Sequence, residues 1–262
     1  MTLSTTEVER FVRDGFVKVE GAFSMEAAAA WREKLWAEAK LSPDDPSTWP
    51  PVVRLPGYGE PPHARAFNTP RLHEAFDQLA GADRWIAPAG IGTFVLRFPV
   101  PGEVNDDGWH IDVSFPGPNS GPTDFLTWRA NSASRDRLGL VLLLFTDVGL
   151  DDAPTRIRIG SHLPTARRLA TYGEAGESLI NLGRAGFGES AHLPEALAIG
   201  EAGTAYICHP FLVHAAQKNL GARPRFLAQP PLQPKPNGQV QLQRAAGDYS
   251  PVERAIRLAL SL

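Results

Sequence analysis

A histidine and an aspartate stand two residues apart in the segment Trp109-His110-Ile111-Asp112. Residues two apart on a β-strand point to the same face, so the imidazole of His110 and the carboxylate of Asp112 are predicted to point at one place. Imidazole nitrogen and carboxylate oxygen are both ligands for first-row transition metals. A His-x-Asp pair is also common by chance, as a strand-end histidine beside a solvated aspartate. The pair is therefore a candidate metal site that needs a third ligand.

Four later histidines are candidates for the third ligand. His192 lies in a polar stretch, His162 follows a Gly-Ser pair that favours a turn, and His209 precedes a proline that restricts its backbone. His214 lies in the apolar run 211–216, where an unpaired imidazole is costly to bury. We therefore favour His214 as the third ligand. A core histidine bonded to the backbone is the alternative for this residue.

Arg225 provides a second signal. It follows His214 in a predicted strand after a turn at 219–222, and antiparallel pairing is expected to return it beside the strand of His214. A buried guanidinium needs a carboxylate partner, and none is evident nearby in the sequence. A bound dicarboxylic acid would supply one with bidentate geometry.

The three ligands together limit the metal and its chemistry. Two histidines and one carboxylate form the facial triad of non-haem iron, which leaves positions open for a bidentate 2-oxo acid and O₂. Zinc accepts the same ligand types, so the ligands alone do not select the metal.

Short β-prone runs separated by turn residues fill about residues 91–232, which predicts a mainly β fold of the sandwich or jelly-roll kind. The predicted strands cover residues 16–19, 93–98, 109–115, 139–147, 155–159, 204–208, 212–216 and 225–227. Flanking helices are predicted at residues 5–12, 24–40, 71–79 and 251–260, from Ser4, Ser24 and Pro70 as start signals and from residue composition. Residues 42–63 are predicted to be a loop, and 165–201 a surface excursion with a short helix.

The composition narrows the possible partners and compartment. The chain has 262 residues and a formal net charge of −3, which gives no indication of a nucleic-acid or membrane partner. One domain is expected at this length, with a helical part at about 1–90 and a jelly-roll core at 91–232. Its single cysteine, Cys208, excludes a disulfide within the chain and favours a reducing, cytoplasmic location. No apolar run approaches the roughly 20 residues of a membrane helix, and the N-terminus does not resemble a signal peptide.

Several motifs together resemble the phytanoyl-CoA dioxygenase family, a branch of the Fe(II)/2-oxoglutarate-dependent oxygenases. The matching features are the opening run 8–17, the His110-x-Asp112 pair, the stretch from Asp147 to Gly160-Ser161-His162, and His214, Asn219 and Arg225 at the family's spacing. The resemblance spans most of the chain and implies a double-stranded β-helix core.

The resemblance also implies a role for each site residue. His110, Asp112 and His214 would hold Fe(II), and Arg225 would bind the C5 carboxylate of 2-oxoglutarate. The implied reaction uses O₂ to hydroxylate or otherwise oxidise a C–H bond of a small organic substrate, with release of succinate and CO₂. In halogenating relatives a small residue replaces the carboxylate ligand, so Asp112 indicates oxygen transfer.

The chain departs from the family where substrate loops are expected. Residues 151–154 replace the usual Asn-Gly, Ile159 replaces a proline, and residues 128–137 look like an insertion. These departures concern the substrate rather than the metal site. Trp109, Arg129 and Arg156 are candidate substrate contacts, with core packing and solvated charge as their alternative roles. A CoA thioester and an intermediate of natural-product biosynthesis are both compatible substrates.

Two other functions compete with the oxygenase. A cupin-like zinc-dependent hydrolase or isomerase would use the same ligands but would not need Arg225. A non-catalytic 2-oxo-acid binding module would need Arg225 but not three metal ligands with an open coordination face.

Overall fold

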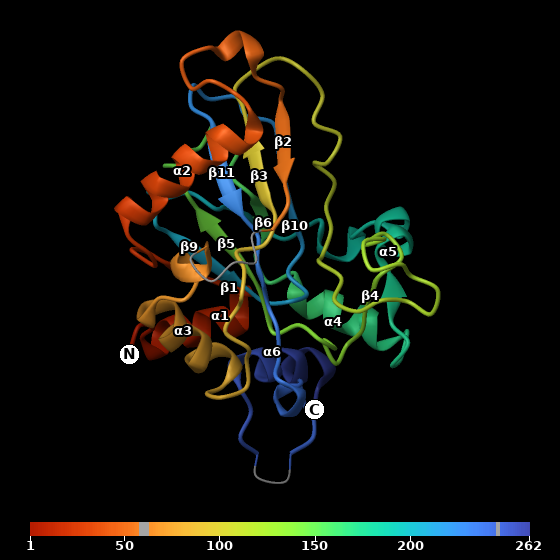
Figure 1. Cartoon of the computed structure of the whole chain (residues 1–262). Coiled ribbons are helices and arrows are strands. Elements are labelled where there is room, and N and C mark those ends of the chain that lie inside the picture. Colours follow the sequence, from red (N-terminus) through yellow and green to blue (C-terminus); the bar gives the residue numbers. More distant parts are fainter. Residues whose placement is uncertain (58–62, 245–246) are drawn as a thin grey trace.

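The computed structural model describes residues 1–57, 63–244 and 247–262. Its centre is a pair of antiparallel sheets (Figure 1). The large sheet has the order β1-β9-β5-β11-β3-β2, with β12 also paired to β5, and the small sheet has the order β10-β6-β8. The large-sheet strands are β1 Phe16–Val19, β2 Val52–Leu55, β3 Phe94–Arg97, β5 Gly139–Leu144, β9 Ala205–Cys208, β11 Arg225–Ala228 and β12 Pro231–Leu232. The small-sheet strands are β6 Arg156–Arg158, β8 Glu195–Leu197 and β10 His214–Ala215.

The chain passes repeatedly between the two sheets. It leaves the large sheet after β5, forms β6 and β8 in the small sheet, returns as β9, crosses again to β10 and returns as β11. All of these pairings are antiparallel. This alternation is that of a double-stranded β-helix, and it confirms the predicted mainly β, jelly-roll fold with flanking helices.

The two faces of the large sheet have different neighbours because side chains alternate along each strand. On β11, Phe226 belongs to the main hydrophobic cluster, which lies on the helical side of the sheet. Leu227 belongs to a second cluster, together with Ile157 of the small sheet. Arg225 has the parity of Leu227 and therefore points between the two sheets. This alternation brings a charged residue of a buried strand into the interior of the jelly roll.

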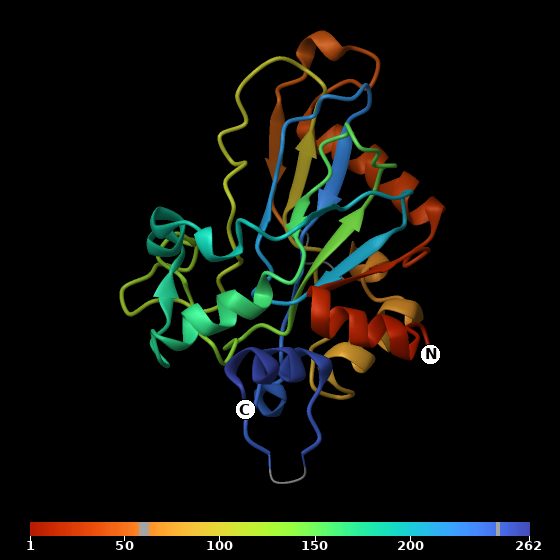
Figure 2. The same cartoon turned by 180° about the vertical axis from the view of Figure 1, so that it is seen from behind.

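In the described part of the chain, the sheets are flanked by six α-helices: α1 Thr5–Asp14, α2 Met25–Ala39, α3 Pro70–Ala80, α4 His162–Ala170, α5 Leu179–Ala185 and α6 Pro251–Leu260. Helix α2 packs Trp31 against Phe94 and Phe145, and Trp36 against Phe226. Helices α1, α3 and α6 gather at one end of the sheets, with α4 against α6 (Figures 1 and 2). None of the described helices is long and apolar enough to cross a membrane.

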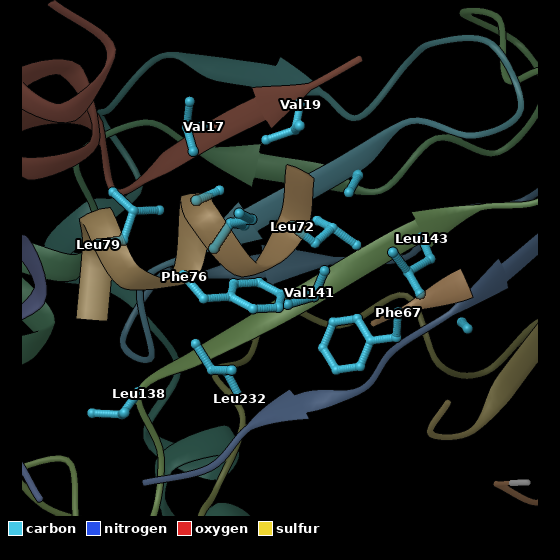
Figure 3. Packing of buried hydrophobic residues seen from close by; sticks show 14 of the residues in the cluster. Val17, Val19, Phe67, Leu72, Phe76, Leu79, Leu138, Val141, Leu143 and Leu232 are labelled. Carbon is cyan, nitrogen blue, oxygen red and sulfur yellow. The ribbon is translucent and has the colours of Figure 1, made fainter. Parts of the chain in front are cut away.

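Helix α3 and the large sheet share one apolar core. Figure 3 shows Leu72 and Phe76 of α3 beside Val141 and Leu143 of β5. All four side chains are fully buried. Burial of one such side chain contributes about 1.5–3 kcal/mol to the free energy of unfolding, relative to leaving it exposed. The N-terminal helices are thus attached to the sheet by extensive apolar packing.

The structure corrects the predicted loop at 42–63. Val52–Leu55 forms β2, the edge strand beside β3. The prolines at positions 50, 51 and 56 obscured it, since proline is tolerated at the ends of edge strands. Strands β1 and β2 therefore place part of the predicted helical segment 1–90 within the large sheet.

Two further predictions were partly wrong. Residues 109–115 do not form a regular strand but two isolated bridges, His110 to His214 and Phe115 to Arg129. The chain changes partner between these two points, so no continuous ladder forms. The predicted excursion at 165–201 contains α5 and strand β8, which extends the small sheet, and β7 Glu177–Ser178, which pairs with β4 Arg129–Ala130.

Candidate active site

His110, Asp112 and His214 lie together at the small sheet. One potential ligand atom from each residue lies within 4.8 Å of the other two. The backbones of His110 and His214 exchange both hydrogen bonds, at 3.0 and 2.9 Å. This direct cross-strand pairing brings the two imidazoles to a centroid separation of 4.4 Å. Asp112 reaches the same place because it lies two residues beyond His110, while Ile111 between them is buried in the core.

Both imidazoles are oriented by the backbone. Nδ1 of His110 lies 2.9 Å from the carbonyl oxygen of Gly108, and Nδ1 of His214 lies 3.0 Å from that of Leu212. A carbonyl only accepts, so each Nδ1 carries the proton and donates. The lone pair of each ring is then on Nε2, which is the arrangement of a histidine ready to bind a metal.

Asp112 has its own partner, Arg137. Nη1 of Arg137 donates to Oδ2 of Asp112 at 3.2 Å, and Nη2 donates to the carbonyl oxygen of Val113 at 3.0 Å. The Arg137 side chain is 13% exposed and that of Asp112 is 28% exposed. The guanidinium therefore bridges the carboxylate and the backbone of the neighbouring core residue.

The site is in the protonation state that metal binding requires. Burial opposes ionisation of Asp112, but Arg137, followed by His214 and His110, lowers its pKa below the usual value. Burial, reinforced by His110, lowers the pKa of His214 to about 4 despite the nearby Asp112. Near neutral pH the residues therefore offer a carboxylate and a neutral imidazole, the forms that bind metals.

A small cavity of about 60 Å³ joins the two histidines to Arg225. It is lined by Arg54, Val95, Arg97, Asp106, His110, Thr155, His214, Ala216, Arg225 and Gln229. Arg225 is 2% exposed, and its Nη1 donates to the carbonyl oxygen of Ala153 at 2.8 Å. Burial, followed by Arg97, lowers the pKa of Arg225 to about 9, so the group stays charged at neutral pH. Within residues 1–57, 63–244 and 247–262, no carboxylate forms an ion pair with it.

Arg97 adds a second cation to this cavity. It pairs in register with Arg225 across β3 and β11, and its side chain is 1% exposed. Its Nη2 donates to Oδ2 of Asp106 at 2.6 Å, and Asp106 also pairs with the half-exposed Arg54. Three buried nitrogens here have no hydrogen-bond partner in the part of the chain that the structure describes: Nε and Nη1 of Arg97 and Nε of Arg225. Buried donors of this kind are costly unless a ligand satisfies them, so the cavity suits an anion.

The remaining histidines lie elsewhere. His192 is exposed, as predicted. His162 and His209 are buried beside each other, with ring centroids 4.8 Å apart, at the junction of α1, α4 and α6. The predicted turn is present at residues 159–161, and His162 begins α4 directly after it. Its Nε2 bonds to the carbonyl oxygen of Val12 at 3.0 Å. Gly15, with φ 88°, leaves room for this ring, because a Cβ at that position would lie 2.5 Å from Nδ1.

His162 is expected to make the fold acid-sensitive. Burial lowers its pKa to about 4, although Val12 and Asp14 oppose this. The unfolded chain binds the proton at about pH 6.5. The free energy of unfolding is therefore expected to fall as pH drops from about 6.5 to 4, by up to ~3 kcal/mol from this group.

Urea unfolding of the wild type and His162→Gln at pH 7 and pH 4.5 measures this effect. Glutamine can still donate to Val12 but cannot take up a proton in this range, so its loss of stability at pH 4.5 should be smaller. His192→Gln, at the exposed histidine, serves as the control. Equal losses in all three proteins would show that His162 does not cause the acid sensitivity.

The candidate substrate residues have backbone partners. Nη1 of Arg129 donates to the carbonyl oxygen of Gly176 at 2.8 Å, and Nη2 of Arg156 donates to that of Asp107 at 2.9 Å. The guanidinium groups of Arg156 and Arg158 lie over the Trp109 ring, at 4.7 and 4.1 Å from its centre. The contacts of Trp109 with Arg156 and Arg158 of β6 thus hold the segment before His110 against the small sheet.

Three polar residues of the site were not predicted from the sequence: Arg97, Asp106 and Arg137. Arg97 had a usable signal, because a lone arginine interrupts the apolar strand 94–98. Asp106 lies in a polar loop, and Arg137 is one of several arginines in the predicted insertion. Nothing local distinguished Asp106 or Arg137 from solvated charges.

Solved structures similar to this one include iron- and 2-oxoglutarate-binding enzymes. HygX from Streptomyces hygroscopicus, with nickel and 2-oxoglutarate bound, has a TM-score of 0.56 and 18% identity, over 89% of this chain and 88% of HygX. The epimerase SnoN, in complex with Fe³⁺, α-ketoglutarate and nogalamycin RO, has a TM-score of 0.56 and 17% identity, over 88% of this chain and 82% of SnoN. EctD from S. alaskensis with bound Fe has a TM-score of 0.56 and 18% identity, over 92% of this chain and 79% of EctD.

Sequence-level comparisons add nothing to these structural ones. No protein-family model matches the chain, and no curated protein matches it. At such low identity, the similar structures establish the fold. The chain thus has the fold of the non-haem iron, 2-oxoglutarate-dependent enzymes, and its own residues must carry the argument for activity.

Proposed function

We propose that this protein is an Fe(II)/2-oxoglutarate-dependent dioxygenase of the phytanoyl-CoA dioxygenase type. One observation carries the proposal: two oriented histidines and Arg225 line the same cavity. A 2-oxo dicarboxylate could contact both, with a chelating 2-oxo acid at the metal and a second carboxylate at the guanidinium. The double-stranded β-helix fold agrees with this assignment.

The residues fit the metal and the co-substrate. Nε2 of His110 and of His214 and a carboxylate oxygen of Asp112 would hold the iron, because the two Nδ1 atoms are already used by the backbone. Iron bound there would supply oxygen activation coupled to the decarboxylation of 2-oxoglutarate, which releases succinate and CO₂. Arg225 would orient the co-substrate by its C5 carboxylate, with Arg97 adding positive charge. The buried walls of the cavity would exclude water from the reaction.

For the substrate, we propose a small organic molecule, oxidised at a C–H bond, from natural-product biosynthesis. A HygX structure contains hygromycin B and a SnoN structure contains nogalamycin RO, while an EctD structure contains 5-hydroxyectoine. In this chain Trp109, Arg129 and Arg156 remain our candidate substrate contacts. Since Arg129 and Arg156 each donate to backbone carbonyls, we propose that they shape the site rather than offer a free positive charge. A cytoplasmic location remains a prediction.

The test is an anaerobic titration of the Fe(II) protein with 2-oxoglutarate. A weak visible charge-transfer band is expected, because a 2-oxo acid that chelates Fe(II) produces one. The Zn(II) protein should bind 2-oxoglutarate without this band, since Zn²⁺ has a filled d shell.

The outcomes separate the competing functions. Absence of the band at saturating Fe(II) and 2-oxoglutarate would contradict the proposal. Tight Zn(II) binding with no affinity for 2-oxoglutarate would favour the cupin-like hydrolase or isomerase. Binding of 2-oxoglutarate without metal would favour a non-catalytic binding module.

A further inference from the structure

The backbone at Arg137 is held by hydrogen bonds on both sides of this residue along the chain. Its backbone N–H donates to the carbonyl oxygen of Ser134 at 3.2 Å, and the Ser134 hydroxyl donates to the carbonyl oxygen of Arg137 at 2.7 Å. Ser134 is 1% exposed, so the start of this turn is buried. The next residue, Leu138, donates to Leu232 at 2.7 Å at the start of the large sheet. The backbone from which the guanidinium extends is therefore fixed by the fold.

The guanidinium meets Asp112 from one side only. Nη1 donates a hydrogen bond to Oδ2 of Asp112, and Nη2 donates one to the carbonyl oxygen of Val113. A planar guanidinium with two fixed contacts cannot rotate without losing one of them. The carboxylate is consequently held with Oδ2 engaged, and Oδ1 has no hydrogen bond from Arg137.

We propose that Arg137 is a positioning residue for Asp112: it occupies Oδ2, so that the carboxylate presents one oxygen to the metal and the remaining coordination positions stay open. This inference rests on the proposed metal site. It assigns a function to the end of the segment 128–137, which looked like an insertion in the sequence.

The chemistry explains why such a residue is useful. A free carboxylate can bind a metal through one oxygen or two, and a second oxygen would take a position that a bidentate 2-oxo acid and O₂ need. Partners that orient a metal ligand commonly change metal affinity by about 10–100-fold when they are removed. An arginine serves here better than a lysine, because a single ammonium is a point charge and lacks the planar fork that spans two acceptors.

The experiment is an anaerobic Co(II) titration of the whole protein, followed by the d–d absorption band, for the wild type, Arg137→Ala and Arg137→Lys. Arg135→Ala is the matched control: Arg135 lies in the same segment, is 61% exposed and pairs with Asp136. For Arg137→Ala, Co(II) affinity is expected to fall about 10–100-fold. The shape and intensity of the band should also change, because the released Oδ2 can join the metal. The affinity of the Co(II) protein for 2-oxoglutarate should fall with it.

Arg137→Lys is expected to recover part of the Co(II) affinity but not the wild-type spectrum, and Arg135→Ala should match the wild type. If circular dichroism shows that Arg137→Ala does not fold, Arg137→Lys alone is compared with the wild type. Wild-type affinity and spectrum in whichever Arg137 variants fold would overturn the inference. Tighter Co(II) binding with an unchanged spectrum would also overturn it, because the guanidinium would then act only by opposing the metal's charge. Failure of the wild type to bind Co(II) and 2-oxoglutarate would instead remove the proposed function.

Discussion

Replacing His110 or Asp112 by alanine is expected to reduce iron-dependent consumption of 2-oxoglutarate to the level of the metal-free protein, while the fold is retained. Each substitution removes one of three potential ligand atoms that lie within 4.8 Å of one another. Neither side chain belongs to the apolar core, since only Ile111 and Val113 beside them are buried there. Succinate release and O₂ uptake measure the activity, and thermal unfolding measures the fold.

His192→Ala is the control for this experiment. His192 is exposed and is not one of the three candidate ligands, so its replacement should leave both measurements unchanged. Substantial succinate formation by both His110→Ala and Asp112→Ala would contradict the assigned metal ligands. Loss of folded protein in both variants would indicate instead that the two residues serve the structure.

Replacing Arg225 by alanine is expected to weaken 2-oxoglutarate binding on the order of a hundredfold or more. The reason is the loss of two charge-assisted hydrogen bonds, which contribute about 1.5–3 kcal/mol each, where about 1.4 kcal/mol corresponds to a factor of ten. Among the described residues its buried Nε has no hydrogen-bond partner, so a carboxylate can supply one. Arg225→Lys should recover only part of the affinity, because an ammonium lacks the planar fork. Anaerobic titration of the Fe(II) protein measures the affinity.

Arg223→Ala provides a matched control two residues away. Arg223 is 59% exposed and pairs with Asp152 at 2.7 Å, outside the residues that line the cavity. Its affinity for 2-oxoglutarate should be close to that of the wild type. Unchanged affinity in Arg225→Ala would remove the main reason for assigning 2-oxoglutarate as co-substrate. Arg97, which shares the cavity, would then be the next residue to replace.

Local sequence determined much of the architecture. Helix α6 Pro251–Leu260 and strand β1 Phe16–Val19 were predicted at their observed bounds, and the capping box at Ser4 marks the start of α1. These signals act over a few residues, through capping hydrogen bonds and the periodicity of apolar side chains. Strand β2 escaped prediction because its pairing with β3 is a long-range contact, and local composition favoured a loop.

For the candidate site, the sequence by itself determined which residue types were available and which of them share a face. His110 and Asp112 were joined by strand parity, and Arg225 was chosen because its strand was expected to pair with that of His214. That pairing was wrong, since β11 pairs with β3 and β5 while β10 pairs with β6 in the other sheet. Both residues nevertheless line one cavity. Only the tertiary structure decided that His214, rather than His209, faces His110. The reason is physical: the choice depends on the pairing of two segments far apart in the chain, which sets His214 opposite His110 and turns His209 toward α6. The same long-range packing brings Arg97 beside Arg225 and Arg137 beside Asp112. The charges of each pair interact only in the folded protein, because the two residues are far apart along the chain.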